Sequence, residues 1–107
     1  MLKTKHSLGQ LAIELKDFLS KHIAVEHLVL FGSYANGSPR ADSDIDVIVV
    51  SDDFKSMSVF DKISLLANAS VAVDSRIELI GVSTSEYEQA QRGSLLNDIK
   101  QSGRVLI

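Results

Sequence analysis

The sequence predicts an α/β (α+β) domain in which a mixed β-sheet is flanked by helices. Helical and extended patterns follow one another in the order helix, strand, strand, helix, strand, helix, helix, short strand. The composition, with 45% apolar and 23% charged residues, is that of a globular protein. At 107 residues we expect one domain that spans residues 1–107.

The first part of the chain predicts a helix followed by a strand. Apolar residues recur at helical spacing from Leu8 to Leu19, which places the helix at about residues 7–21 with Ser7 as its N-cap. Residues 25–31 then form an apolar strand, and Gly32 ends it.

The next segment predicts a loop and a second strand. Residues 33–42 contain Gly37 and Pro39, the only proline, and form a turn and loop in which Ser33 is a possible helical start. Residues 45–50 are a nearly continuous β-branched run, which is typical of a strand buried on both faces.

The second half predicts three helices and two strands. The boundaries of these elements follow from four patterns, which are the helical spacing of apolar residues, the alternation of side chains along a strand, the capping-box spacing and a glycine at a helix end. These elements are a helix over residues 58–69, a strand over 73–82, a helix begun by Ser83-Thr84-Ser85-Glu86, a helix over 94–102 stopped by Gly103, and a short strand over 104–107.

Charge and composition exclude several classes of protein. A net charge of −3 is the wrong sign for a protein that mainly coats nucleic acid, so we expect no direct nucleic-acid binding. The absence of cysteine excludes disulfides, thiolate zinc sites and cysteine nucleophiles. No apolar run is long enough to cross a membrane, and the basic N-terminus lacks an apolar signal core, so we expect a cytoplasmic protein.

A glycine-serine turn follows the first strand directly. Gly32 would allow a ligand to approach the backbone, and free N–H groups at Ser33 would favour an anion. The alternative is an ordinary strand-to-helix turn, which commonly uses the same two residues.

Two aspartates open the second apolar strand. Asp44 and Asp46 are two residues apart and therefore point to the same face, where their charges repel unless a cation lies beside them. Magnesium prefers one or two carboxylates together with phosphate oxygens and water. The alternative is an acidic loop in which Asp44 caps a turn, but Asp46 lies within the apolar run, where an unpaired charge is costly.

A third carboxylate is expected from the next strand, and two residues are candidates. We favour Glu78 over Asp74 because it lies deeper in the apolar stretch, between Ile77 and Leu79. A salt bridge from Glu78 to Arg76 is the alternative. Arg40, between the turn and the acid pair, is a candidate contact for a triphosphate, although a lone loop arginine is more often solvated.

These motifs resemble those of a known family. Gly32-Ser33-Tyr34-Ala35-Asn36-Gly37, followed by Ser43-Asp44-Ile45-Asp46-Val47, resembles the signature of nucleotidyltransferases with the polymerase-β-type fold. The chain looks most like the minimal nucleotidyltransferases, which are often the antitoxin partners of HEPN-domain proteins.

The resemblance implies a magnesium-dependent transfer of a nucleoside monophosphate, expected to be AMP from ATP, to a hydroxyl group. Gly32 and Ser33 match the phosphate-binding turn, Asp44 and Asp46 match the metal-binding acids, and Glu78 takes the place of the third acid. The implied acceptor is a tyrosine of a HEPN-type partner protein, and a small alcohol is the second possibility. A homodimer is the other assembly expected for so small a chain.

Two departures from the family pattern keep a second hypothesis open. Asn36 stands where the motif commonly has a basic residue, and Glu78 stands where aspartate is common. A displacement of about 1 Å in a catalytic group can lower a rate on the order of a hundredfold. The alternative is therefore a non-catalytic nucleotide-binding or antitoxin subunit that acts by binding its partner.

Overall fold

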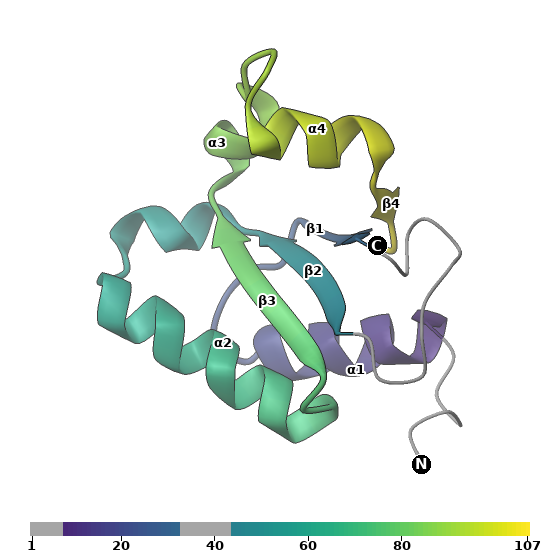
Figure 1. Ribbon diagram of the computed structural model, residues 1–107. Helices are drawn as coiled ribbons and strands as arrows, with labels where there is room; N and C mark the ends of the chain where they lie inside the picture. The colour runs from purple at the N-terminus through teal and green to yellow at the C-terminus, as the bar shows by residue number, and fades with distance from the viewer. Residues whose placement is uncertain (1–7, 33–43) are drawn as a thin grey trace.

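The computed structural model describes residues 8–32 and 44–107 and contains a sheet with helices on both of its faces (Figure 1). The predicted fold class, a mixed sheet flanked by helices, is confirmed. The elements in chain order are α1 (Leu8–Leu19), β1 (His27–Phe31), β2 (Ile45–Val50), the 3-10 helix η3 (Asp52–Ser56), α2 (Val59–Val73), β3 (Ile77–Val82), α3 (Thr84–Glu88), α4 (Leu95–Ser102) and β4 (Arg104–Val105).

The sheet has the strand order β3-β2-β1-β4, so that β3 is an edge strand and β2 lies inside. β1 pairs antiparallel with β2, and β2 pairs parallel with β3. Parallel neighbours need a crossover connection, and η3 and α2 supply it. β2 is buried at five of its six positions, and the exception is Asp46. The prediction of an inner strand over residues 45–50 is therefore confirmed.

Each face of the sheet carries its own apolar cluster. α1 and α2 pack on one face, where their residues Leu15, Leu19 and Leu66 belong to the same larger cluster as Leu30 and Val47 of the sheet. On the other face Tyr87 and Ile99, from α3 and α4, pack against side chains of β1 and β2. Figure 1 shows the two pairs of helices on opposite sides of the strands. In the described residues, no helix is long and apolar enough to span a membrane.

Serine caps fix the starts of three helices. The hydroxyls of Ser58, Ser83 and Ser94 each accept a hydrogen bond from a backbone N–H in the first turn of the helix that follows, which is α2, α3 and α4 respectively. The predicted capping box is present, because the Glu86 carboxylate also accepts from the Ser83 N–H. Gly103 caps the end of α4. Ser7, the predicted cap of α1, lies outside the described residues.

The prediction of a strand over residues 73–82 is wrong in its first part. α2 continues to Val73, four residues beyond the predicted end at Ala69, and β3 begins only at Ile77. Val73 fits the strand alternation that continues through Ile77, yet Ala69 and Val73 lie four residues apart on the helix face that packs into the core. η3 was not expected.

Three apolar residues of α2 do not pack as its spacing suggests. Val59, Phe60 and Ile63 are among the apolar residues whose helical spacing predicts this helix, but they are 70%, 77% and 59% exposed. α2 thus carries more apolar surface than the core of this chain covers.

Asp74 ends α2 and is almost completely buried. Its carboxylate accepts hydrogen bonds from the N–H and the guanidinium of Arg76, at 3.0 and 3.3–3.4 Å. The carboxylate therefore orders the turn between α2 and β3.

We expect Asp74→Ala to lower the free energy of unfolding by about 2–3 kcal/mol, because it removes a buried acceptor of several hydrogen bonds. Urea denaturation measures the change, with Asp17→Ala on the exposed side of α1 as the control. Equal stability of the two variants would contradict a structural role for Asp74.

Candidate active site

The sheet register places Asp46 beside Glu78. The two residues are direct partners in the parallel pair of β2 and β3, and Phe31 of β1 is the partner of Asp46 on its other side. Adjacent strands lie about 4.8 Å apart, and cross-strand partners point to the same face of a sheet. One row across the sheet thus contains two carboxylates from two different strands.

Asp44 adds a third carboxylate next to this row. It directly precedes β2, is exposed, and acts electrostatically on both of the other acids. The charges of Asp44 and Asp46, with a hydrogen bond to Asp44, raise the pKa of Glu78. Partial burial, and then the charge of Asp44, raises the pKa of Asp46. The three predicted acids therefore form one repelling cluster.

Gly32 lies against this cluster. Its φ of +78° is a conformation that side-chain-bearing residues rarely adopt, and a Cβ at this position would be 2.6 Å from Asp46 Oδ2. The glycine is therefore needed both for the turn after β1 and for the space that the Asp46 carboxylate occupies. The structure brings Gly32 and Asp46 together, whereas Ser33, Asn36 and Arg40 lie outside the described residues.

The alternative third acid has another role. Asp74 precedes β3 and pairs with Arg76 at 3.3 Å, so it is not the cross-strand partner of Asp46. The sequence placed Asp74, Arg76 and Glu78 on one face of a strand, but β3 starts after the first two. The preference for Glu78 agrees with the register of the sheet.

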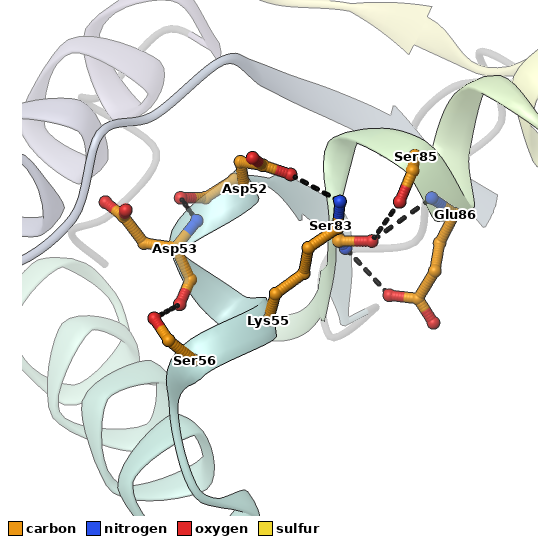
Figure 2. A network of polar contacts seen from close by, with 8 residues as sticks. Asp52, Asp53, Lys55, Ser56, Ser83, Ser85 and Glu86 are labelled. Carbon is orange, nitrogen blue, oxygen red and sulfur yellow. Dashed lines mark hydrogen bonds and ion pairs between the residues drawn. The ribbon is translucent and has the colours of Figure 1, made fainter.

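Other acidic side chains at the opposite ends of β2 and β3 already have hydrogen-bond or ion-pair partners. Figure 2 shows Lys55 reaching Asp52, and Glu86 closing the cap at Ser83. The Asp53 carboxylate accepts from the Ala24 N–H at 2.8 Å. The hydrogen bond from the Ser83 N–H lowers the pKa of Glu86, the opposite direction to Asp46 and Glu78. These acids stabilise the fold.

α3 and α4 leave the acid row open. They cover the part of this face around Val29, Ile48 and Val50, whereas Glu78 and its neighbour Ile80 are exposed. The described helices therefore leave space above the carboxylates for a ligand.

The donor set fits a divalent cation such as magnesium. The ligands would be carboxylate oxygens. Burial and then the charge of Asp44 raise the pKa of Asp46, the charges of Asp44 and Asp46 raise that of Glu78, and a bound cation would offset this repulsion. Among residues 8–32 and 44–107, no three acidic or histidine side chains form a finished metal cage. Magnesium commonly uses only one or two carboxylates and completes its shell with phosphate and water, so an incomplete cage still fits this ion.

Comparison with known proteins identifies the family. Residues 14–107 match the family model described as polymerase beta, nucleotidyltransferase. The chain belongs to the polymerase beta nucleotidyltransferase family. The predicted resemblance is therefore confirmed, and with it the nucleotidyltransferase class. No match was found among the curated proteins.

Solved structures share this polymerase beta fold. A candidate nucleotidyltransferase from Sulfolobus solfataricus is 22% identical, with a TM-score of 0.64 over 92% of this chain and 78% of that one. A toxin–antitoxin complex with AMP-PNP contains a chain that is 24% identical, with a TM-score of 0.65 over 94% and 73% of the two chains.

A third similar structure is the complex of the tri-AMPylated Shewanella oneidensis HEPN toxin with its MNT antitoxin. It contains a chain that is 21% identical, with a TM-score of 0.51 over 91% of this chain and 71% of that one. At these identities the likenesses establish the fold, and the role of each residue in this chain rests on its own geometry.

Sequence reasoning missed two features of this region. Phe31 completes the cross-strand row, and a groove lies between α2 and β3 on the other face of the sheet, with Ile77 and Leu79. The exposed apolar residues of α2 were a signal for the groove, because one helix face cannot bury all of them.

The raised pKa of both Asp46 and Glu78 sets the sign of a pH effect. Each carboxyl binds its proton more tightly in the folded than in the unfolded protein, so the free energy of unfolding falls as the pH rises. The fall begins near the ordinary pKa, which is 3.8 for aspartate and 4.5 for glutamate, and ends above the raised pKa of the folded state. Without metal, the protein should therefore lose stability across this window and stay less stable above it.

We expect magnesium to reverse this loss at pH 7.5. The midpoint of thermal unfolding should rise on the order of 5 °C in excess Mg²⁺, because the cation binds only the folded cluster. Glu78→Gln should keep or raise the metal-free midpoint and should lose most of the magnesium increment, whereas the exposed control Glu88→Gln should behave as wild type. An equal increment in Glu78→Gln would argue against the site.

Proposed function

We propose that this chain is a magnesium-dependent nucleotidyltransferase that moves AMP from ATP to a hydroxyl group on a partner protein, in the manner of an antitoxin. The observation that carries the proposal is the alignment of Asp46 with Glu78 across β2 and β3, beside Gly32. Membership of the polymerase beta nucleotidyltransferase family supports the reaction class.

Each residue has a role in this proposal. Asp44, Asp46 and Glu78 hold the magnesium, and Gly32 and Ser33 bind the triphosphate through their backbone N–H groups, with Arg40 as a further contact. When bound, the magnesium would neutralise charge on the phosphate and lower the pKa of the attacking hydroxyl.

Glu78 is proposed to accept the proton of the acceptor hydroxyl. The hydroxyl oxygen bonds to the α-phosphorus, the bond between that phosphorus and the bridging oxygen breaks, and pyrophosphate leaves. The charges of Asp44 and Asp46 raise the pKa of Glu78 in the metal-free protein. The support for Glu78 as the base is its place beside Asp46 across β2 and β3.

The proposed partner is a HEPN-type protein. Support comes from two of the similar solved structures, which are a toxin–antitoxin complex with AMP-PNP and an AMPylated HEPN toxin with an MNT antitoxin. A homodimer is the other assembly that the small size of the chain suggests. We retain the expectation of one domain and a cytoplasmic location as part of the proposal.

A second candidate function is a subunit that binds nucleotide or partner without catalysis. Asn36, which replaces the common basic residue of the motif, and the glutamate at position 78 favour it. In that case the carboxylates would serve nucleotide binding alone.

Transfer of label from α-phosphate-labelled ATP, in host lysate with Mg²⁺, tests the two functions. We expect the wild type to label a protein. The Asp44→Asn/Asp46→Asn variant should give at least a hundredfold less labelled protein, because without the metal the phosphate charge is no longer neutralised. Asp52→Asn/Asp53→Asn is the matched control, since those acids lie at the other ends of the strands.

The outcome separates enzyme from binding subunit. A mutant that still labels its target, or a wild type that inhibits its partner without labelling it, would contradict the enzymatic proposal. Label in a small molecule would redirect the acceptor from a protein to an alcohol.

A further inference from the structure

Ile80 is an exposed aliphatic residue that lies one row from the acid cluster. It follows Glu78 by two residues on β3, so both side chains lie on the same face, about 6.6 Å apart along the strand. The row that contains Ile80 continues through Ile48 and Val29 to Val105. α3 and α4 bury the two middle side chains to 1% exposure, whereas Ile80 and Val105 at the ends are 46% and 56% exposed. Beside the acids, the cover of this face therefore stops at Ile80.

The free edge of β3 is partly blocked against a further strand. β3 pairs with β2 through its even-numbered residues, so the carbonyls of its odd-numbered residues face outward. Lys62 Nζ donates to the outward carbonyl of Gly81 at 3.1 Å, and Ser70 Oγ donates to that of Ile77. Because these two donors stand in the place of a neighbouring strand, Ile80 stays accessible to a ligand.

The proposed reaction sets the direction in which the nucleotide lies. The acceptor hydroxyl attacks from Glu78 on β3, and the pyrophosphate leaves toward Gly32, which follows β1. The attacking and leaving oxygens are roughly in line at the phosphorus, so this axis crosses the strands and the nucleoside extends to one side of it. Toward the N-terminal ends of β2 and β3, the neighbour of the site is the exposed, charged Asp44. Toward the other ends, the exposed neighbour of Glu78 is Ile80, which is uncharged like a nucleoside.

We infer that Ile80 packs against the ribose and base of the bound nucleotide and is a specificity-determining residue of the site. The inference rests on the proposed nucleotidyl transfer and adds the surface that carries the nucleoside. The ribose is joined to the α-phosphate through one oxygen and one carbon atom, so it lies next to the acids. Its carbon atoms and the flat base offer apolar area to an aliphatic side chain. Because Ile80 has no polar side-chain atom, the contact favours a nucleoside triphosphate over a bare polyphosphate and does not select one base.

Calorimetric titration in excess Mg²⁺ tests this contact with two probes. They are a non-hydrolysable ATP analogue and inorganic tripolyphosphate, which lacks a nucleoside. Ile80→Ala should weaken binding of the ATP analogue about fivefold or more, because it removes most of an apolar side chain from the contact. The affinity of this variant for tripolyphosphate should equal that of the wild type, since the acids and Gly32 are unchanged.

Two further variants distinguish the contact from general damage. Val105→Ala is the matched control, because Val105 ends the same row on β4, three strand spacings or about 14 Å away. It should bind both probes as the wild type does. Ile80→Leu keeps an aliphatic side chain of the same size and should keep the affinity for the ATP analogue within about twofold.

Three results would overturn the inference. They are an unchanged affinity of Ile80→Ala for the ATP analogue, a loss in Ile80→Ala that is equal for both probes, and an equal loss in Val105→Ala. A wild type that binds neither probe would instead remove the proposed function, and the nucleoside contact would fall with it. A wild type that binds both probes, with the expected loss in Ile80→Ala, but labels no acceptor would remove only the transfer reaction and would support the contact.

Discussion

The account depends on one constraint, which is the parallel register of β2 against β3. This pairing brings Asp46 and Glu78 side by side and leaves Asp44 next to both. Three carboxylates at such spacing repel one another, and the fold holds them there because the rest of β2 is buried in an apolar core. A one-residue slip would turn Asp46 into that core and bring a buried valine or isoleucine out, so the hydrophobic pattern fixes the position of the acids.

The acidic residues fall into two groups, those with hydrogen-bond partners that stabilise the fold and those of the cluster that, among the described residues, lack such a partner for their charge and would bind a cation. Asp53, Asp74 and Glu86 each accept hydrogen bonds from backbone N–H groups, and the hydrogen bond to Glu86 lowers its pKa. Partial burial and the charge of Asp44 raise the pKa of Asp46, and the charges of Asp44 and Asp46 raise the pKa of Glu78. Their neutralisation would come from a ligand, which is the behaviour expected of a nucleotide and metal site.

Much of this could be predicted from the sequence, for identifiable reasons. The β-branched run of residues 45–50 and the serine caps at positions 58, 83 and 94 act locally, so their elements were predicted correctly. The end of α2 was predicted four residues too early, because Val73 fits both a helix and a strand pattern, and only its packing on the core decides between them. The exposed face of α2 and its groove depend on which residues the core has room for, and a single sequence does not encode that directly.

The central claim is that the Asp44, Asp46 and Glu78 cluster binds a divalent cation together with a nucleotide. The most direct measurement is a crystal structure with Mn²⁺ and a non-hydrolysable ATP analogue, in which anomalous scattering locates the metal. The account predicts an anomalous peak coordinated by Asp44 and Asp46, with the α-phosphate beside Glu78 and the triphosphate against Gly32. A metal bound elsewhere, or a nucleotide bound with no metal at these acids, would contradict it.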